Sequence, residues 1–268
     1  MAETLATAVA GADLERRFGG VARLYGDAGA ARLRAAHIAV VGIGGVGSWA
    51  AEAIARCAVG RITLIDMDHV AESNTNRQIH ALGDAYGQAK VLAMASRIAA
   101  INPVCDVRTI DDFVTVENAA MLIEGYDTVL DCIDQVRAKA ALIAQARVRH
   151  IPVVTCGAAG GRIDAARVRT GDLALITGDP LLARVRHRLR RDHGFPREAV
   201  RRRKFHVLAV YSDEPLQRPA TAQCEPGEFV GGLACSGYGS SVAVTATMGF
   251  VAASAALERI AGAAEERA

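Results

Sequence analysis

Three glycines and an aspartate in the first quarter of the chain have types and spacing that suit phosphate chemistry. Gly42, Gly44 and Gly47 follow an apolar run with the spacing G-x-G-x-x-G, and Asp66 ends the next apolar run. Glycines at this spacing let a turn approach phosphate oxygens, and the following helix offers free N–H groups to the anion. The aspartate can accept hydrogen bonds from ribose hydroxyls. Residues 38–66 therefore predict a strand–helix–strand unit that binds a nucleotide, with a structural glycine turn as the alternative.

Further polar groups follow at positions that suit a polyphosphate. Asn74 and Arg77 lie in the loop after Asp66, Lys90 lies on a predicted helix, and Asp134 follows a predicted buried strand. Arginine and lysine supply positive charge, and a carboxylate can hold Mg²⁺. A hydride-transferring dehydrogenase does not need this set. A nucleotidyl-transfer enzyme does, because attack on the α-phosphate develops charge that must be neutralised.

Simpler interpretations exist for some of these residues. Lys90 by itself fits a solvated charge on a helix, and Asp131 and Asp134 fit caps of the helix that follows. We interpret Asp131 as structural. His80 and His206 have no partner that the sequence identifies.

The elements that must position these groups follow from the apolar pattern. Strands are predicted at 38–41, 62–65, 107–110, 128–133 and 151–155, and helices at 13–36, 87–100 and 136–148. This alternation fits an α/β fold with a doubly wound, mainly parallel sheet. We expect one domain over 1–268, with a nucleotide-binding core at 38–155. The extension at 156–268 is predicted to hold hairpins, a basic segment and an apolar helix.

Composition limits the alternatives. Of 268 residues 51% are hydrophobic, which is ample for a core, and the net charge is only +2, so any surface for nucleic acid must be local. The six cysteines contain no C-x-x-C pair, which argues against a disulfide framework and a four-thiolate zinc site. The N-terminus lacks the features of a secretory signal, so the expected compartment is the cytoplasm.

An uncharged stretch from 229 to 257 is long enough to span a bilayer. It is rich in Gly, Ala, Ser and Thr and begins like a loop. A buried or dimer-interface helix over about 242–260 is the favoured interpretation, and membrane insertion is the alternative.

The motifs VVGIGGVGS, LIDMDHVAESNTNRQ, GQAK with INP, and DCIDQVRAK resemble an adenylating superfamily. It contains the ubiquitin-activating enzymes and the bacterial proteins that adenylate small sulfur carriers. The resemblance covers residues 38–155 and implies a Rossmann-like fold that uses ATP and Mg²⁺, and it leaves room for a monovalent cation. By the same resemblance Asp66 binds the ribose, Asn74, Arg77 and Lys90 contact the phosphates, and Asp134 ligates Mg²⁺. The implied ATP-binding set is Gly42, Gly44, Gly45, Gly47, Asp66, Asp68, Asn74, Arg77 and Lys90, and the implied catalytic set is Arg77, Lys90, Asp134 and Arg17.

Within this superfamily the chain resembles the tRNA threonylcarbamoyladenosine dehydratases along nearly its full length. The matching stretches are RFGGVARLYG, TNRQIHAL, PVVTCGAAGGRID and ACSGYGSSVAVTATMGFVA. Members cyclise the threonylcarbamoyl group on an adenosine beside the anticodon and consume ATP. The implied route is attack of the threonyl carboxylate on the α-phosphate, followed by ring closure by the ureido group, which expels AMP. Ring closure is intramolecular and benefits from a high effective molarity.

Two departures from the superfamily stand out. The zinc-binding C-x-x-C pairs of many sulfur-carrier activators are absent, so no zinc is expected. In those relatives an arginine of the partner subunit reaches ATP from a motif like R-Y-x-R-Q, whereas here the stretch reads Arg17-Phe-Gly-Gly20. Arg17 or Arg23 is the candidate replacement in a homodimer. The resemblance also allows a cysteine desulfurase sulfur-acceptor system as a partner. Cys235 lies in a glycine-rich loop and could accept sulfur or an acyl group, but an inert thiol is the favoured interpretation.

Positive charge is concentrated between Arg184 and Lys204, where ten of 21 residues are Lys or Arg. A solvated helix is the simpler interpretation, but Gly194 and Pro196 divide the run. Arginine-rich arms suit the phosphates of a folded RNA. The predicted tRNA-binding residues are Arg184, Arg188, Arg191, Arg201, Arg202, Arg203 and Lys204.

Three other functions stay open from the sequence. The same fold could adenylate the C-terminus of a ubiquitin-like sulfur carrier. A nicotinamide-dependent oxidoreductase would use only the glycine loop and Asp66, and a nucleotide-sensing scaffold would not turn over ATP. If ATP but not NAD protects the protein against thermal unfolding, the oxidoreductase is excluded.

Overall fold

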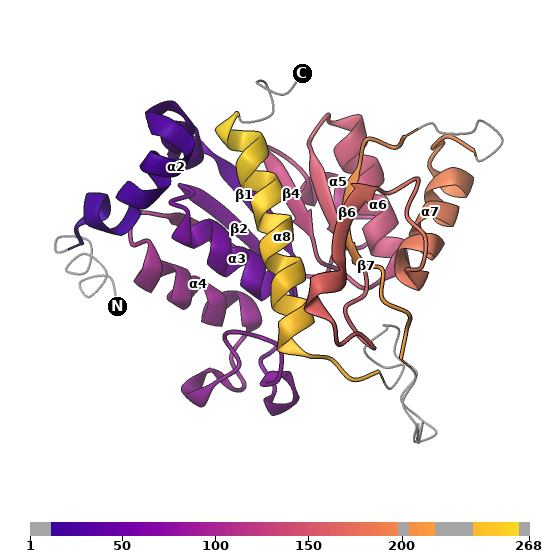
Figure 1. The fold of residues 1–268 in the computed structure, drawn as a ribbon, viewed down its shortest axis with the longest axis horizontal. Coiled ribbons are helices and arrows are strands. Elements are labelled where there is room, and N and C mark those ends of the chain that lie inside the picture. The colour runs from indigo at the N-terminus through magenta and orange to yellow at the C-terminus, as the bar shows by residue number, and fades with distance from the viewer. Residues whose placement is uncertain (1–11, 198–203, 218–237, 263–268) are drawn as a thin grey trace.

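The computed structural model describes residues 12–197, 204–217 and 238–262. They build an α/β fold around a seven-stranded sheet with the order β3-β2-β1-β4-β5-β7-β6 (Figure 1). All neighbouring strands are parallel except β6 and β7. The strands are β1 (His37–Val41), β2 (Arg61–Ile65), β3 (Asp106–Ile110), β4 (Thr128–Asp131), β5 (Val153–Cys156), β6 (Val168–Asp172) and β7 (Leu208–Ser212).

Helices cover both faces of the sheet, which explains why the central strands are apolar on both sides. Ile38 and Val40 of β1 share a core with α2, α3, α4 and α8, whereas Ala39 and Val41 face α5, α6 and α7. The helices are α2 (Leu14–Ala35), α3 (Gly47–Arg56), α4 (Lys90–Ile101), α5 (Ala119–Leu122), α6 (Val136–Val148), α7 (Pro180–Asp192) and α8 (Val242–Ala261). Three short 3-10 turns are η1 (Glu72–Asn74), η2 (Gly83–Ala85) and η3 (Ala165–Arg167).

Most predicted elements are confirmed, and three predictions are corrected. The helix expected from residue 87 begins only at Lys90, because the preceding residues form a 3-10 turn and a bridge between His69 and Ala89. The strand expected over 128–133 ends at Asp131, where the chain turns toward α6. The C-terminal half does not form simple hairpins: β6 and β7 pair antiparallel, but α7 lies between them in the sequence.

Helix α8 lies across the front of the sheet beside α3 (Figure 1). Gly249 permits the close approach, since a Cβ there would lie 2.5 Å from the carbonyl oxygen of Val46. The helix is long and apolar enough to cross a membrane, yet half of its apolar 18-residue stretch is buried inside the fold. This finding agrees with the predicted buried helix. Its outer face leaves Val242 and Phe250 exposed, and Phe250 meets Trp49 edge to face.

Candidate active site

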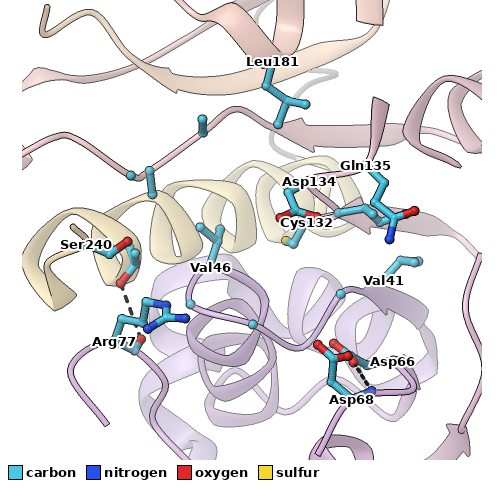
Figure 2. A pocket seen from close by; sticks show the side chains of 18 of the residues that line it. Val41, Val46, Asp66, Asp68, Arg77, Cys132, Asp134, Gln135, Leu181 and Ser240 are labelled. Atoms are coloured by element: carbon cyan, nitrogen blue, oxygen red, sulfur yellow. Dashed lines mark hydrogen bonds between the residues drawn. The ribbon is translucent and has the colours of Figure 1, made fainter. Parts of the chain in front are cut away.

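A cleft of about 520 Å³ opens at the carboxyl ends of β1, β2 and β4. The strand order reverses between β1 and β4, and open α/β sheets bind ligands at such a switch point. The glycine loop and Asp66 line one side, and Asp134 and Gln135 line the opposite side (Figure 2). A further wall of the cleft, called the far wall below, consists of residues 157–160 with Pro180 and Leu181.

The three glycines of the loop have different tasks. Gly42 has a φ of 86°, and a Cβ there would lie 3.0 Å from the carbonyl of Cys132. At Gly47 a Cβ would lie 1.9 Å from the carbonyl oxygen of Gly42, so this glycine closes the turn and does not line the cleft. A Cβ at Gly44 would meet no atom of the surrounding structure within 4 Å, and Gly44 lines the cleft with Gly45. The backbone at Gly44 is therefore open to a ligand.

Asp66 braces the glycine loop. One carboxylate oxygen accepts the N–H of Ile43 at 2.6 Å, and the other accepts the N–H of Asp68 at 2.8 Å. Burial raises the pKa of Asp66, although Lys90 and these two hydrogen bonds act in the opposite direction. Each oxygen keeps a second acceptor position, which is the capacity that a ribose hydroxyl needs.

Two cationic side chains reach the cleft from the loop after β2 and from α4. The ammonium of Lys90, at the start of α4, lies 2.6 Å from the carboxylate of Asp68, and its side chain is buried. Arg77 donates to the carbonyl of Ser73 at 2.7 Å, and burial lowers the pKa of its guanidinium. Both cations line the cleft on the side of the glycine loop.

Asn74 is buried and its side-chain oxygen accepts the N–H of Ala71 at 3.0 Å. This bond holds the short turn η1 and keeps the side chain at the cleft wall. Thr245 of α8 lines the cleft next to Arg77, so the C-terminal helix also contributes to the site.

Asp134 differs from the other acidic groups of the cleft. Within the described residues its carboxylate has no hydrogen-bond or ion-pair partner, while Asp66 and Asp68 are both engaged. No cluster of three metal-ligating side chains occurs in the described ranges. Mg²⁺ commonly takes one protein carboxylate together with phosphate oxygens, so a single free aspartate fits a site completed by the nucleotide.

Sequence reasoning missed the residues that shape the far wall. Asp179 caps α7 by accepting the N–H of Leu182 at 2.9 Å, and it also accepts the N–H of Ala158 at 3.0 Å. Burial raises the pKa of Asp179, and nearby Arg162 opposes this. The pair Asp179-Pro180 is a recognisable helix start and could have predicted the cap. It could not have predicted the contact with the wall.

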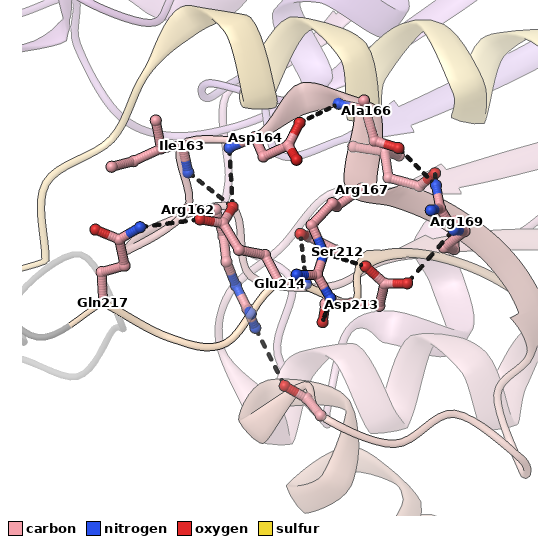
Figure 3. Close-up of polar contacts among 12 residues, drawn as sticks. Arg162, Ile163, Asp164, Ala166, Arg167, Arg169, Ser212, Asp213, Glu214 and Gln217 are labelled. Carbon is pink, nitrogen blue, oxygen red and sulfur yellow. Dashed lines mark hydrogen bonds and ion pairs between the residues drawn. The ribbon is translucent and has the colours of Figure 1, made fainter.

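A second network joins the segment that follows residues 157–160 to the segment after β7 and to the residues just before α7 (Figure 3). Glu214 accepts the N–H groups of Ile163 and Asp164, both at 2.9 Å, and these bonds lower the pKa of Glu214. The buried guanidinium of Arg162 donates to the carbonyl of Gly178, just before α7. The segment after β5 is thus tied to the segments around β7 and α7.

The predicted RNA-binding residues divide into two groups. Arg184, Arg188 and Arg191 line a shallow groove on α7 together with His187 and Val136. The groove adjoins the cleft, because Pro180 and Leu181 at the start of α7 line the cleft itself. Lys204 is exposed, and Arg201, Arg202, Arg203 and Cys235 lie outside the described residues.

Arg17 does not reach the cleft of its own chain. Its guanidinium donates to the carbonyls of Ala100 and Ile101 at the end of α4, at 3.1 and 2.8 Å. Arg23 is exposed on α2. If Arg17 or Arg23 contacts ATP as predicted, it does so in the cleft of a second subunit.

Three comparisons relate the chain to known proteins. Residues 18–267 match the ThiF family. The chain is 50% identical over 252 residues to tRNA threonylcarbamoyladenosine dehydratase of Escherichia coli K12, covering 91% of this chain and 93% of that protein. Its fold matches a crystal structure of E. coli tRNA N6-threonylcarbamoyladenosine dehydratase in complex with ATP, with a TM-score of 0.85, 48% identity and coverage of 96% and 99%. A complex of that enzyme with AMP matches with a TM-score of 0.85, 49% identity and coverage of 95% and 98%.

Proposed function

The chain belongs to the ThiF family, and we propose that it is an ATP-dependent tRNA threonylcarbamoyladenosine dehydratase. Half of the aligned residues are identical to a relative of that name, and the alignment covers nearly the whole of both chains. The relative binds ATP and AMP in structures that share this fold, which suits an enzyme that splits ATP at the α-phosphate.

The observation that carries the proposal is the continuity between the cleft and the basic groove. Pro180 and Leu181 form the wall of the cleft, and the next turns of the same helix present Arg184, Arg188 and Arg191. Phosphate contacts position a nucleic acid without reading its sequence. An RNA held on α7 would place a nucleotide at the far wall of the cleft, facing the phosphates of ATP.

The groups of the cleft have distinct roles in this reaction. Asp66 accepts hydrogen bonds from the ribose, and the backbone at Gly44 lies along the phosphates. Lys90 and Arg77 neutralise the charge that develops on the pyrophosphate as it leaves. Mg²⁺ held by Asp134 would add further charge neutralisation at the phosphate oxygens. The far wall of the cleft holds the carboxylate of the modified adenosine in line with the α-phosphorus. Such positioning is the main task of a phosphoryl-transfer site.

The proposed reaction has two steps. A carboxylate oxygen of the threonyl group bonds to the α-phosphorus, and the bond to the departing pyrophosphate breaks. The ureido group then bonds to the acyl carbon and loses a proton to solvent, and the bond between this carbon and AMP breaks. The second step joins two parts of one held substrate, so orientation supplies most of its rate.

The test is nucleoside analysis of threonylcarbamoylated tRNA after incubation with the protein, ATP and MgCl2. We expect a nucleoside lighter by one water, with AMP and pyrophosphate formed in equal amounts. Reactions without ATP and with the Asp134→Asn variant serve as controls. An unchanged tRNA, together with ATP–pyrophosphate exchange that depends on a small ubiquitin-like protein, would establish the sulfur-carrier activity instead.

We also propose that the enzyme is a cytoplasmic homodimer. Val242 and Phe250 are exposed on the outer face of α8, and the uncharged, small-residue segment that contains most of this helix is the part of the chain predicted to lie at a dimer interface. In a homodimer, Arg17 or Arg23 would act in the cleft of the other subunit, since neither lines the cleft of its own chain. Light scattering without detergent should give twice the 28.1 kDa of one chain. A monomer would overturn this part, and partition into membranes would favour the spanning-helix alternative.

A further inference from the structure

An ion pair lies entirely inside the fold, directly beneath the turn that carries Asp134. The ammonium of Lys139 on α6 lies 3.0 Å from the carboxylate of Asp131 at the end of β4, and neither side chain is exposed at all. Lys139 belongs to a part of α6 in which every residue from Ala138 to Ala144 is buried. Removing two charges from water is costly, so the arrangement needs a full set of compensating bonds.

The compensation is complete. The three N–H bonds of Lys139 have three acceptors: the Asp131 carboxylate, the Asp131 carbonyl at 3.1 Å and the Ile133 carbonyl at 2.8 Å. The other oxygen of Asp131 accepts the hydroxyl of Thr155 on β5 at 2.7 Å. Asp131 also accepts the N–H of Ile133 at 3.3 Å. Side chain and main chain of the turn are therefore fixed from below.

This turn connects two parts of the proposed active site. Asp134 follows Ile133 directly and lines the cleft with a carboxylate that has no partner among the described residues. On its other side the turn supports the glycine loop, because the backbone of Cys132 packs against Gly42. A change in the turn would move both the carboxylate and the loop that faces the phosphates.

We propose that Lys139 is a positioning residue: paired with Asp131, it holds the turn in the one shape that aims Asp134 at the metal–nucleotide complex. The role rests on the function proposed above. It is distinct from stability, since apolar side chains of similar volume commonly replace a buried ion pair without loss of stability. What apolar side chains cannot do is bind two main-chain carbonyls of the turn.

The main test variant is Asp131→Asn/Lys139→Met, which removes both charges together and leaves neither unpaired. Its matched control is Glu52→Gln/Arg97→Met. That pair joins α3 to α4 at 2.6 Å around a buried Glu52 and does not line the cleft. Both variants lose one buried carboxylate and one cation. Glu52 also pairs with the exposed Arg56, so the control tests whether breaking an ion-pair network outside the cleft is enough to change metal binding.

The readout is binding of Mn²⁺, as a probe for Mg²⁺, to the protein–ATP complex by electron paramagnetic resonance, with ATP affinity in EDTA measured alongside. We expect Mn²⁺ affinity to fall about tenfold in the Asp131/Lys139 variant, a size typical of groups that orient a metal ligand. ATP affinity in EDTA and both properties of the control should stay near wild type. Neither measurement needs tRNA, so the result stands apart from the dehydratase assay.

Two further variants extend the test. Thr155→Val removes only the hydroxyl that Asp131 accepts, and it should weaken Mn²⁺ binding in the same direction if the double variant fails to fold. Adding Asp134→Asn to Asp131→Asn/Lys139→Met should cost nothing beyond Asp134→Asn alone, because residues that act through one group are not additive. Wild-type Mn²⁺ affinity in a folded Asp131/Lys139 variant or in Thr155→Val, an equal loss in the control, or full additivity with Asp134→Asn would each overturn the assignment.

Discussion

The ammonium of Lys90 is held 2.6 Å from the carboxylate of Asp68, and of the two side chains only that of Asp68 is exposed to solvent to any large extent. The pair lines the cleft below the glycine loop. A phosphate group arriving there would compete with Asp68 for the same ammonium. Asp68 therefore holds Lys90 in place before the nucleotide binds. Once a phosphate displaces Asp68 from the ammonium, water can solvate the exposed Asp68 carboxylate.

Replacing Lys90 tests this relationship. Lys90→Met should lower the rate of AMP formation about 100-fold, the usual effect of losing one charge-stabilising donor at a transition state. ATP affinity should fall less than the rate. Arg149→Met is the control, because Arg149 is an exposed cation that lines neither the cleft nor the basic groove. Equal rates in the two variants, measured with saturating ATP and tRNA, would remove Lys90 from the catalytic set.

Gly44 and Gly47 should respond in opposite ways to a side chain. Gly44→Val should fold normally and lose ATP binding, since the added atoms enter open space in the cleft. Gly47→Ala should lower the thermal unfolding midpoint, because its Cβ would overlap the carbonyl oxygen of Gly42. Thermal unfolding with and without ATP separates the two effects. A Gly44→Val protein that ATP still stabilises would show that phosphate does not approach this backbone.

Asp134 should control turnover more than nucleotide binding. Asp134→Asn removes the charge of the free carboxylate and should cut Mg²⁺-dependent AMP formation about 100-fold, while ATP affinity in EDTA stays near wild type. Asp84→Asn on the exposed loop before α4 is a matched control for a lost carboxylate. A wild-type rate in Asp134→Asn would mean that another group holds the metal.

The basic residues of α7 should bind tRNA through its phosphates. Changing Arg184, Arg188 and Arg191 to Ala should weaken tRNA binding and reduce the slope of log affinity against log salt by about 0.7–0.9 for each lost contact. ATP binding should not change. The corresponding change of Arg201, Arg202 and Arg203 to Ala tests the second arm in the same way.

The control for both triple variants removes the same charge from exposed arginines outside the groove, namely Arg16, Arg34 and Arg149. An unchanged tRNA affinity in both test variants at moderate salt would identify the segment as a solvated face. An equal loss in the control would indicate nonspecific attraction to a positive surface.

His80 should make the fold sensitive to acid. It is buried, and desolvation, with Lys90 and Arg97 adding to it, lowers its pKa from 6.5 to about 4. The unfolded chain therefore binds a proton below pH 6.5 that the folded chain refuses, so stability should fall between pH 6.5 and 4 by up to about 3 kcal/mol. His80→Leu should flatten this part of the curve in urea unfolding. An equally steep decline in the variant would assign the acid sensitivity to other groups.

The parts of the site that the sequence predicts are those set by local spacing. The turn at Gly42 to Gly47 and the strand ending at Asp66 depend on neighbours within a few residues, and helix α6 has the bounds expected. Lys90 and Asp134 are identified only through motifs, since their convergence on one cleft requires the order of the strands. Nothing in the sequence reports that order directly.

The residues that escaped prediction have partners far along the chain. Glu214 binds main-chain groups at 163 and 164, and Asp179 binds the wall at Ala158. Lys139 lies in a helix whose apolar pattern marks its position as core, and its task becomes visible only with Asp131 beneath the turn. A buried charge is recognisable in a sequence, but the group that compensates it is not.

The insertion of β7 between β5 and β6 has a consequence for the making of the protein. During synthesis β6 emerges well before β7, its sheet partner, and β5 keeps an open edge until residue 212 has left the ribosome. Helix α8, which covers the same face as α2 and α3, follows β7 in the chain and emerges later still. The nucleotide-binding half therefore stays partly uncovered until α8 has been synthesised, and nascent chains tend to aggregate at unpaired strand edges of this kind. Early folding of the first half would leave an apolar face exposed, because α8, which covers that face, lies far along the chain from β1.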